Sequence, residues 1–362
     1  MKRIIVAFSL LGLFVSSSFA IQSGLLPYGV GARYAGMGGA ASAIVDDITS
    51  AYYNPAGIVK SGRVELKLGA GAATDGLADI LKVAGNASDP AKFIADNINN
   101  TININGGVNG LIGLNIAKIG VTILPLGNLS LVKVPGFNGA ASARLAYEGI
   151  LTIGYGLSTP VLPVAALDLG LNVKYVGSVL AGSNAAANSA ANSITSLSGM
   201  GFDLGAKAKI DTFAIPFSAA IVIKDIGESL SGKTKSNTTT YDPITGTTSN
   251  SADVETDASA TSPTTIVIGA STTIPGIGLK IAADIDSVSG SGASYSVTHL
   301  GIEYPLTVVA LRAGYVTGNN GNISMTTIGA GFNFFGNLNL AMIMDGKDSK
   351  NNSAVFDTGF AF

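Results

Sequence analysis

Hydrophobic and polar residues alternate along most of the chain after residue 62. Between residues 167 and 175, apolar residues occupy every second position and alternate with Asp168, Gly170, Asn172 and Lys174. The same period of two recurs at 202–209, 279–286 and 299–304. Successive side chains of a strand point to opposite faces, so the pattern predicts strands with one apolar face and one face of charged residues and glycine.

Fourteen segments carry this pattern and are expected to be strands. Their ranges are approximately 63–73, 105–117, 119–125, 144–157, 166–180, 199–210, 213–225, 264–274, 278–286, 295–304, 308–317, 324–335, 338–345 and 354–362. Many of them come near the ~9 to 11 residues with which a tilted strand crosses a bilayer. An even number of strands places both ends of a barrel on the same side of the membrane.

The connections between these segments alternate in length. The longer ones are 74–104, 126–143, 181–198, 226–263, 287–294, 318–323 and 346–353. The intervening ones are short, except for the eight residues of 158–165. Short turns at one end and long loops at the other are typical of outer-membrane barrels, with the turns in the periplasm and the loops outside the cell. The sequence therefore predicts an all-β fold, a 14-stranded antiparallel transmembrane β-barrel over residues 63–362.

The composition separates this barrel from a soluble β-sandwich, whose strands also alternate. Only 12% of the residues are charged, 47 are glycine, and the mean hydropathy is +0.44. No stretch after residue 20 has the length and hydropathy of a transmembrane helix. A membrane barrel gives this combination because its lipid-facing residues occupy only alternate positions. Its sheet must close, since lipid satisfies no backbone polar group.

The first twenty residues have the features of a signal peptide. Lys2 and Arg3 precede an apolar run, and Ser18 and Ala20 supply the small residues before a cleavage site. The alternative, a membrane anchor, is disfavoured because the apolar run is shorter than the ~20 residues of a spanning helix. The chain has no cysteine, which excludes a lipid-anchored N-terminus and a disulfide scaffold. Its slightly acidic balance excludes a nucleic-acid partner.

Three phenylalanines share one face of the last expected strand: Phe356, Phe360 and Phe362. Such an aromatic-ended strand resembles the signal that outer-membrane barrels present to their assembly machinery. We therefore expect that machinery to bind the chain through Phe362.

Two of the long loops differ in character. Residues 231–263 are rich in Thr, Ser, Asn and Asp and are expected to form a solvated surface loop. The first long loop instead carries apolar residues at helical spacing, which predicts two short amphipathic helices outside the barrel: Leu77, Ile80 and Leu81, then Phe93 and Ile94. These helices either pack on neighbouring loops, or they capture an apolar ligand or close the mouth of the barrel.

The inward-facing charges are of both signs, which argues against a strongly ion-selective pore. They are Glu65, Lys67, Arg144, Glu148, Asp168, Lys174, Asp203, Lys207, Lys280, Asp284, Glu303 and Arg312. These side chains either pair with one another in a hydrated interior or anchor a plug.

Catalytic residues are scarce. The only histidine is His299, and its own strand offers only Ser296 nearby, a weak basis for a Ser–His hydrolase. One histidine and no cysteine make a zinc site unfavourable. The motif GESLSGKT at 227–234 has the spacing of a phosphate-binding loop, but a Thr- and Asn-rich stretch follows it where that loop requires a helix. We expect no enzyme, metal or cofactor.

The stretch GARYAGMGGAASAIVDDITSAYYNPAG at 31–57 lacks the third glycine of a dinucleotide-binding loop. It resembles the N-terminal region of the FadL-like outer-membrane transport superfamily, which includes a PorV-type branch. The matching residues are Gly31-Ala32-Arg33, Gly36-Met37-Gly38-Gly39-Ala40, Asp46-Asp47 and Asn54-Pro55-Ala56-Gly57. Two C-terminal segments, THLGIEYPLTVVALRAGYVTGN and AGFNFFGNLNLAM, are more similar to the PorV-type branch than to the classical fatty-acid transporter.

The resemblance implies that residues 21–62 form a hatch inside the periplasmic end of the barrel. Its residues include Gly36, Gly38, Gly39, Asp46, Asp47, Asn54, Pro55 and Ala56. Small residues allow the hatch backbone to approach the inner wall, and Asn54 before Pro55 is pushed out of the helical region. Asp46 and Asp47 are expected to meet inward-facing Lys or Arg side chains.

The resemblance also implies passive uptake of long-chain fatty acids or other hydrophobic small molecules across the outer membrane of a Gram-negative bacterium, gated by the hatch. The alternative is a PorV-type component that binds or shuttles secreted proteins. A general diffusion pore is less compatible with a plugged barrel.

Overall fold

The computed structural model describes residues 29–73, 102–133, 139–158, 164–186, 189–210, 215–242, 244–245, 247–319, 321, 323–333, 336–347 and 352–362. The expected signal peptide at 1–20 and the two expected loop helices, with Leu77, Ile80, Leu81, Phe93 and Ile94, lie outside these residues. Within the described ranges, no helix is long and apolar enough to cross a bilayer.

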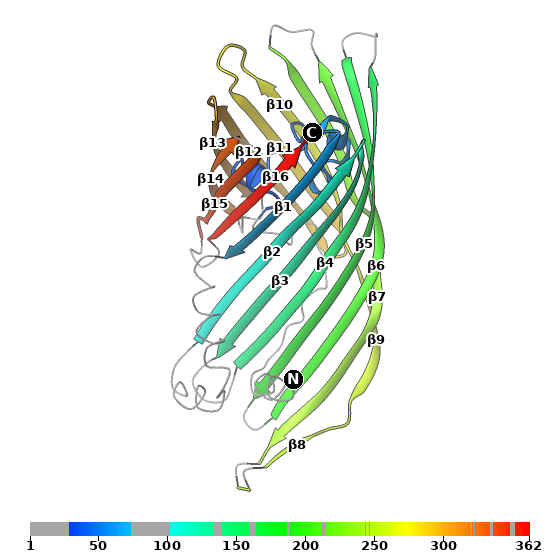
Figure 1. Cartoon of the computed structure of the whole chain (residues 1–362). Helices are drawn as coiled ribbons and strands as arrows, with labels where there is room; N and C mark the ends of the chain where they lie inside the picture. Colours follow the sequence, from blue (N-terminus) through cyan, green and yellow to red (C-terminus); the bar gives the residue numbers. More distant parts are fainter. Residues whose placement is uncertain are drawn as a thin grey trace.

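Fourteen antiparallel strands form the barrel (Figure 1). They are β1 (Val64–Ala73), β2 (Ile102–Ile116), β3 (Ile119–Lys133), β4 (Gly139–Ser158), β5 (Val164–Ala186), β6 (Ser189–Ile210), β7 (Phe217–Tyr241), β10 (Thr264–Thr273), β11 (Lys280–Gly290), β12 (Ala293–Pro305), β13 (Val309–Gly318), β14 (Ser324–Asn333), β15 (Asn337–Asp345) and β16 (Ser353–Ala361).

Two pairings close the ring. β1 pairs with β16, from Glu65 opposite Ala361 to Ala73 opposite Ser353, and β7 pairs with β10. Each of the other strands pairs with its neighbours along the chain. The closed 14-stranded antiparallel barrel expected from the alternation is confirmed.

The strands β4 to β7 are much longer than expected. They contain 20 to 25 residues and project past the ends of β10 to β16 (Figure 1). The expected loops at 126–143, 181–198 and 226–263 are therefore largely strand. The supposed solvated loop at 231–263 contains the end of β7 and two further strands, β8 (Thr248–Asn250) and β9 (Val254–Thr261), both paired with β7. Buried residues such as Ala190, Thr195 and Leu197 still alternate with exposed ones along this part of β6, but Ser, Thr and Asn on both faces hide the period of two in the sequence.

The expected loop at 287–294 is a tight turn. β11 and β12 are joined by Ser291 and Gly292, whose φ angles of 52° and 79° are the paired positive values of a type I′ hairpin turn. Because the turn needs only two residues, both strands continue into the stretch that was expected to be loop.

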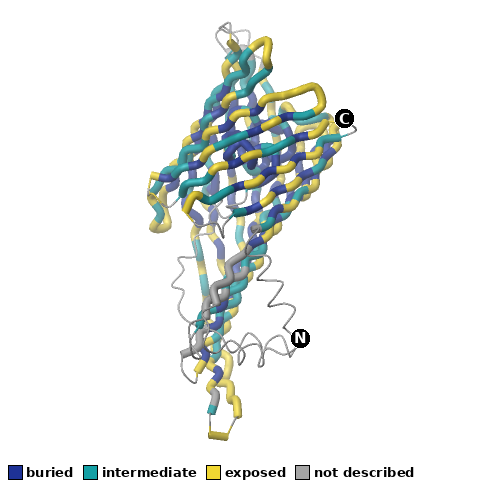
Figure 2. The backbone as a smooth tube through the Cα atoms, turned by 90° about the vertical axis from the view of Figure 1, so that its left-hand side faces the viewer, coloured by how far each residue is buried: buried dark blue, intermediate teal, exposed yellow. Residues whose placement is uncertain are grey.

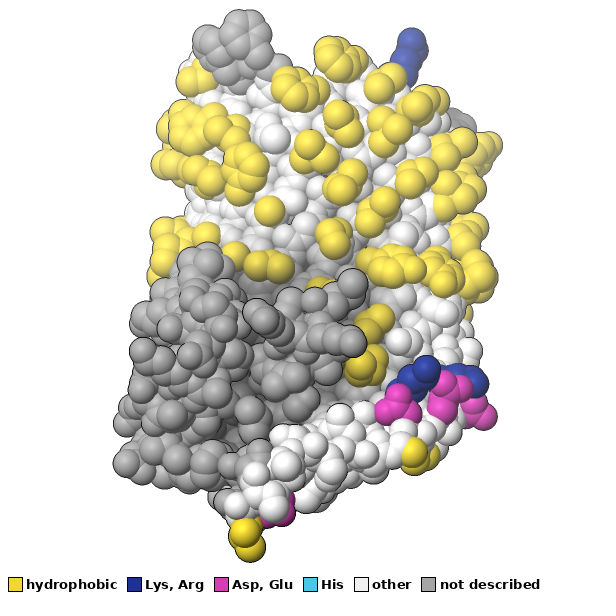
Figure 3. All heavy atoms as spheres, turned by 60° about the horizontal axis from the view of Figure 1, so that its bottom comes forward, with side chains coloured by type: hydrophobic (Ala, Val, Ile, Leu, Met, Phe, Trp, Pro, Cys, Tyr) yellow, Lys and Arg dark blue, Asp and Glu magenta, His cyan; other side chains and the backbone are white. Residues whose placement is uncertain are grey.

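The wall of the barrel is apolar outside and polar inside. Along β11, Ile281 and Ile285 are 39% and 53% exposed, whereas Asp284 between them is 3% exposed. Exposed and buried residues alternate in this way along the strands (Figure 2). Hydrophobic side chains are spread over the barrel wall seen in Figure 3, and most of the charged side chains visible there gather on the extension, with one Lys or Arg at the opposite edge of the molecule. The apolar outer face identifies a transmembrane barrel.

The N-terminal segment, residues 29–62, lies inside the barrel (Figure 1). It contains α2 (Ala32–Ala35), α3 (Ser50–Tyr53) and the 3₁₀-helix η2 (Pro55–Lys60), joined by turns. Its apolar residues form the main hydrophobic core together with inward-facing Leu111, Leu124 and Ile150 of the wall. The segment packs nearest the turn end of the barrel, the end with the short β2–β3 and β12–β13 turns.

The position of β10 in the wall predicts a response to charge at its lipid face. Ile268 is 61% exposed in the middle of β10, and Ile268→Arg should destabilise the barrel by roughly 2–4 kcal/mol, the cost of a cation near a bilayer centre. Urea unfolding in lipid vesicles measures this. Asn250→Arg on exposed β8 is the control and should change stability by less than about 0.5 kcal/mol. Equal stability of the two variants would contradict this placement.

Candidate functional site

Carboxylates on the inner wall hold the backbone of the N-terminal segment. Asp284 of β11 accepts hydrogen bonds from the backbone N–H groups of Ala41 (2.9 Å) and Ser42 (2.8 Å) and from the Ser42 hydroxyl (2.8 Å). Asp357 of β16 accepts one from the Ala32 N–H at 2.5 Å, and Glu65 of β1 accepts one from the Ile48 N–H at 3.0 Å. Three inward charges thus satisfy backbone donors that helices and sheets leave unpaired.

Arg33 ties the segment to a buried charge cluster on the wall. Its guanidinium makes two hydrogen bonds to Glu303 of β12, Nε to Oε2 at 2.9 Å and Nη2 to Oε1 at 3.0 Å. Glu303 also accepts hydrogen bonds from Lys280 and Arg312, each at 2.8 Å. Arg33 reaches Asp46 at 2.6 Å, so Asp46 pairs within the segment and not with a wall cation.

Asp47 does pair with a wall cation. Its carboxylate accepts a hydrogen bond from the buried Lys67 ammonium of β1 and another from the Thr49 hydroxyl. Burial raises the pKa of Asp47, but the charges of Lys67 and Arg33 and these hydrogen bonds lower it more, so the pKa lies below its ordinary value. Asp47 is therefore a charged anchor at neutral pH.

Glycines let the segment touch the wall backbone to backbone. A Cβ on Gly36 would lie 3.0 Å from the Gly329 Cα, and one on Gly38 would lie 2.9 Å from the Leu300 carbonyl oxygen. The wall also needs a residue without a side chain at this contact, since a Cβ on Gly314 would lie 2.2 Å from the Gly38 nitrogen. Gly38 and Gly39 also have φ angles of 67° and 80°, which disfavour other residues.

A second close contact joins the wall to residues Asn54, Pro55 and Ala56 of the segment. A Cβ on Gly170 of β5 would lie 2.1 Å from the Pro55 carbonyl carbon, and one on Gly205 of β6 would lie 2.1 Å from the Asn54 Oδ1. Asn54 is extended (φ −159°), donates to the Ser42 carbonyl at 2.8 Å and accepts from the Ala56 N–H at 3.0 Å. Its side chain therefore caps η2 while joining two turns of the segment.

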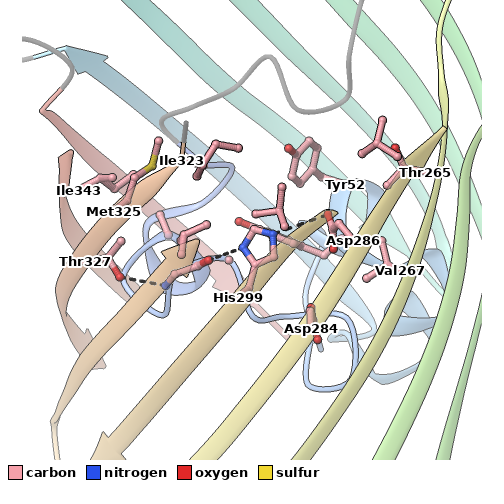
Figure 4. Close-up of a pocket in the computed structure, with 18 of the residues that line it drawn as sticks. Tyr52, Thr265, Val267, Asp284, Asp286, His299, Ile323, Met325, Thr327 and Ile343 are labelled. Carbon is pink, nitrogen blue, oxygen red and sulfur yellow. Dashed lines mark hydrogen bonds and ion pairs between the residues drawn. The ribbon is translucent and has the colours of Figure 1, made fainter. Parts of the chain in front are cut away.

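A cavity of about 180 Å³ lies between the N-terminal segment and strands β7 and β10 to β15 (Figure 4). Most of its wall is apolar and comes from side chains on six strands: Val267, Val288, Val297, Val316, Met325 and Ile343. The floor is formed by segment residues, among them Gly38, Gly39 and Tyr53. The cavity is on the side of the segment that faces away from the turn end, and a molecule entering through the other end of the barrel meets it before the segment.

One side of this cavity is polar, and we call it the polar pole: Asp286, His299, Lys224 and Tyr52. His299 Nδ1 lies 2.7 Å from the Gly38 carbonyl oxygen, and His299 Nε2 lies 3.7 Å from Asp286 Oδ2 (Figure 4). The Lys224 ammonium lies 4.9 Å from the centre of the Tyr52 ring, within cation–π distance. The polar pole thus combines an anion, a cation and an imidazole beside an apolar wall.

The arrangement offers binding groups and no catalytic pair. Within the described residues, Ser296 and His299 make no hydrogen bond to each other; the His299 Nδ1 instead contacts the Gly38 carbonyl, and its Nε2 lies 3.7 Å from Asp286. Among the described residues, no three His, Asp or Glu side chains are placed to hold a metal ion. The motif at 227–234 is extended in β7, without the helix that a phosphate loop requires.

Sequence reasoning identified the contact glycines and the wall charges but not the cavity. Asp284, Glu303 and Lys67 were recognised as inward-facing, and each holds the segment. Lys224 and Tyr52 were missed because they are 172 positions apart and carry no shared motif. The signal that was available for Asp286 is its place on the inward face of β11, two residues after Asp284, which pairs with the only histidine of the sequence.

The packing at Gly170 predicts that a single methyl group displaces part of the segment. Gly170→Ala should lower hydrogen-exchange protection of residues 51–56 by about tenfold or more, because overpacking a tight contact typically costs 1–3 kcal/mol. Gly149→Ala in β4 is the matched control, since its Cβ would find only the Tyr175 carbonyl oxygen, at 3.9 Å. Equal protection in both variants would show that the contact at Gly170 does not hold the segment.

No family model and no curated protein sequence match the chain. Solved structures do. The Pseudomonas putida toluene transporter TodX superposes with a TM-score of 0.61 at 12% identity, covering 92% of this chain and 99% of its own. The Ralstonia pickettii toluene transporter TbuX gives a TM-score of 0.61 at 14% identity, covering 93% and 100%. A Pseudomonas aeruginosa FadL homologue gives 0.53 at 10% identity, covering 91% and 97%. The chain therefore has the fold of the FadL-like outer-membrane transport barrels, the superfamily that its N-terminal motif resembles.

Proposed function

We propose that the protein is an outer-membrane barrel for passive uptake of hydrophobic small molecules. The observation that carries this is the cavity inside a membrane-spanning wall, lined mostly by apolar side chains and placed directly against the N-terminal segment. Structures with the same fold include the toluene transporters TodX and TbuX. Binding followed by a conformational step suffices for such transport, and no catalytic group is needed.

The size of the cavity favours a compact molecule. A dry apolar cavity of ~150 Å³ is enough to bind benzene, whereas sites for drug-sized ligands span ~300–1,000 Å³. The cavity of about 180 Å³ is slightly larger than the first value and smaller than the second range. A long-chain fatty acid would need additional space along the barrel, so we favour a molecule about the size of one aromatic ring as the substrate.

We further propose that the N-terminal segment acts as the hatch, with the domain limits 21–62 and 63–362. Its anchors are hydrogen bonds and ion pairs to the wall at Asp284, Glu303, Lys67 and Asp357. Water can replace these hydrogen bonds and ion pairs one at a time. The backbone contacts at glycine also have no interlocking side chains, so they do not prevent the segment from moving. A ligand leaving the cavity for the turn end must displace this segment.

A second candidate function is a PorV-type role, in which secreted proteins bind the barrel. The feature that favours it is the extension, which carries the exposed strands β8 and β9 past the barrel. A stable complex with exported proteins that is lost on trimming residues 229–261 would support it.

In either role, we propose that Phe362, 84% exposed at the end of β16, is the residue through which the assembly machinery binds the chain.

Filling the cavity tests the uptake proposal. Val297→Trp should reduce the rate of toluene uptake by cells producing the barrel by about tenfold, because the indole takes up the space that one aromatic ring requires. Loss of toluene from a sealed headspace above the cells measures the rate. Val121→Trp, on the outer face of β3 and 52% exposed, is the control and should take up toluene at the parental rate. Unchanged uptake by a correctly assembled Val297→Trp barrel would refute the proposed route.

A further inference from the structure

We propose that the cavity prefers a neutral aromatic-sized molecule that carries one hydroxyl group, a phenol or a similar ring alcohol, over the matching hydrocarbon. This inference rests on the proposed uptake function and names its substrate class. It follows from the polar pole, because each of its charged groups restricts the kind of ligand that the apolar wall can receive.

Asp286 is the group in the polar pole that needs a hydrogen-bond donor from the ligand. It faces the cavity from β11, and its carboxylate has no hydrogen-bond donor among the described residues. Asp284, two residues away on the same face, is by contrast saturated by the Ala41 and Ser42 donors. A carboxylate that loses water to a hydrocarbon ligand without gaining a donor is strongly unfavourable, so a hydrocarbon leaves Asp286 unpaired.

His299 adds a second acceptor at the same place. Its Nδ1 carries the proton, because its partner at 2.7 Å is the Gly38 carbonyl oxygen, which can only accept. In the neutral imidazole, Nε2 is therefore an acceptor and faces Asp286 Oδ2 across 3.7 Å, longer than a hydrogen bond. A hydroxyl has one proton to donate, so a ligand hydroxyl bound here donates either to Asp286 or to His299 Nε2, which lie beside each other (Figure 4).

Lys224 gives the polar pole charges of both signs. Because it lies in the same lining as the Asp286 anion, a charged ligand of either sign meets one attractive and one repulsive group there. A neutral hydroxyl meets neither repulsion. It both donates and accepts, and can therefore donate to Asp286 while its oxygen faces the Lys224 side of the cavity.

The polar pole also connects the ligand to the N-terminal segment. The Gly38 carbonyl that receives the His299 proton belongs to the segment, and the Gly38 N–H donates to Thr327 of β14 at 2.9 Å. A hydroxyl bound beside His299 is thus one residue away from a backbone contact that holds the segment. The residues that would recognise the ligand hydroxyl therefore also contact the segment that is proposed to gate the barrel.

Phenol and toluene form a matched pair for testing this, since a hydroxyl replaces a methyl of similar size. Binding of each to the full-length barrel is measured by calorimetry in detergent, with protein-free micelles as the blank. Asp286→Leu should lower the phenol-to-toluene affinity ratio about tenfold relative to the parental barrel, the loss of one hydrogen bond to a charged group. Comparing ratios cancels the different hydrophobicity of the two ligands.

Two further variants complete the experiment. Asp286→Asn keeps an acceptor of the same shape and should lower the ratio less than Asp286→Leu, provided that both variants show the heat-modifiable mobility of a folded barrel. Asp257→Leu on exposed β9 removes a carboxylate outside the cavity and should leave the ratio unchanged. A ratio that does not respond to Asp286→Leu would overturn the hydroxyl inference while leaving hydrophobic uptake intact. Failure of both ligands to bind the parental barrel would refute the uptake proposal as well.

Discussion

The interior of this barrel depends on one constraint: at its tightest contacts with the N-terminal segment, the wall residue must be glycine. Gly36 and Gly38 face Gly329 and Gly314, and Asn54 and Pro55 rest on Gly170 and Gly205 in the same manner. A barrel of fourteen strands leaves limited space once its inward charges are in place. The glycine contacts bring the segment backbone within reach of Asp284 and Thr327, and those hydrogen bonds give the segment its fixed position. The cavity exists because the segment stops there, short of Val288, Val297 and Ile343.

The inward charges explain how a buried segment can be held without being locked. Most of them pair with each other or with backbone donors of the segment, as Glu303 does with Arg33, Lys280 and Arg312. Buried pairs of this kind contribute position more than net stability, because desolvation offsets much of their attraction. Asp286 differs because the described residues leave it without a donor, and it lies in the cavity. The same inner face that anchors the segment therefore supplies the polar group that a ligand must satisfy.

The sequence predicted the membrane-facing half of the fold closely and the rest less well. The expected strands 264–274 and 324–335 correspond to Thr264–Thr273 and Ser324–Asn333, because lipid on one face enforces strict alternation. The extension was mistaken for loops, since Ser, Thr and Asn occupy its buried as well as its exposed positions, as at Thr195 and Thr239, and hide the period of two in the sequence. The residues that contact the segment were visible as inward charges and as a motif. The cavity was not, because it joins Tyr52, Lys224 and Ile343 from distant parts of the chain.

The central claim is that hydrophobic molecules pass this barrel only when the N-terminal segment moves. A Cβ on Gly113 of β2 would lie 3.4 Å from the Ile48 Cβ, close to the separation that a disulfide spans, and the chain contains no other cysteine. Ile48→Cys combined with Gly113→Cys therefore fixes the segment to the wall when oxidised and releases it when reduced. Toluene uptake by cells producing this variant is the most direct measurement. The account predicts uptake near background under oxidising conditions and restored by reductant. Equal uptake in the oxidised and reduced states, with the disulfide verified, would contradict it.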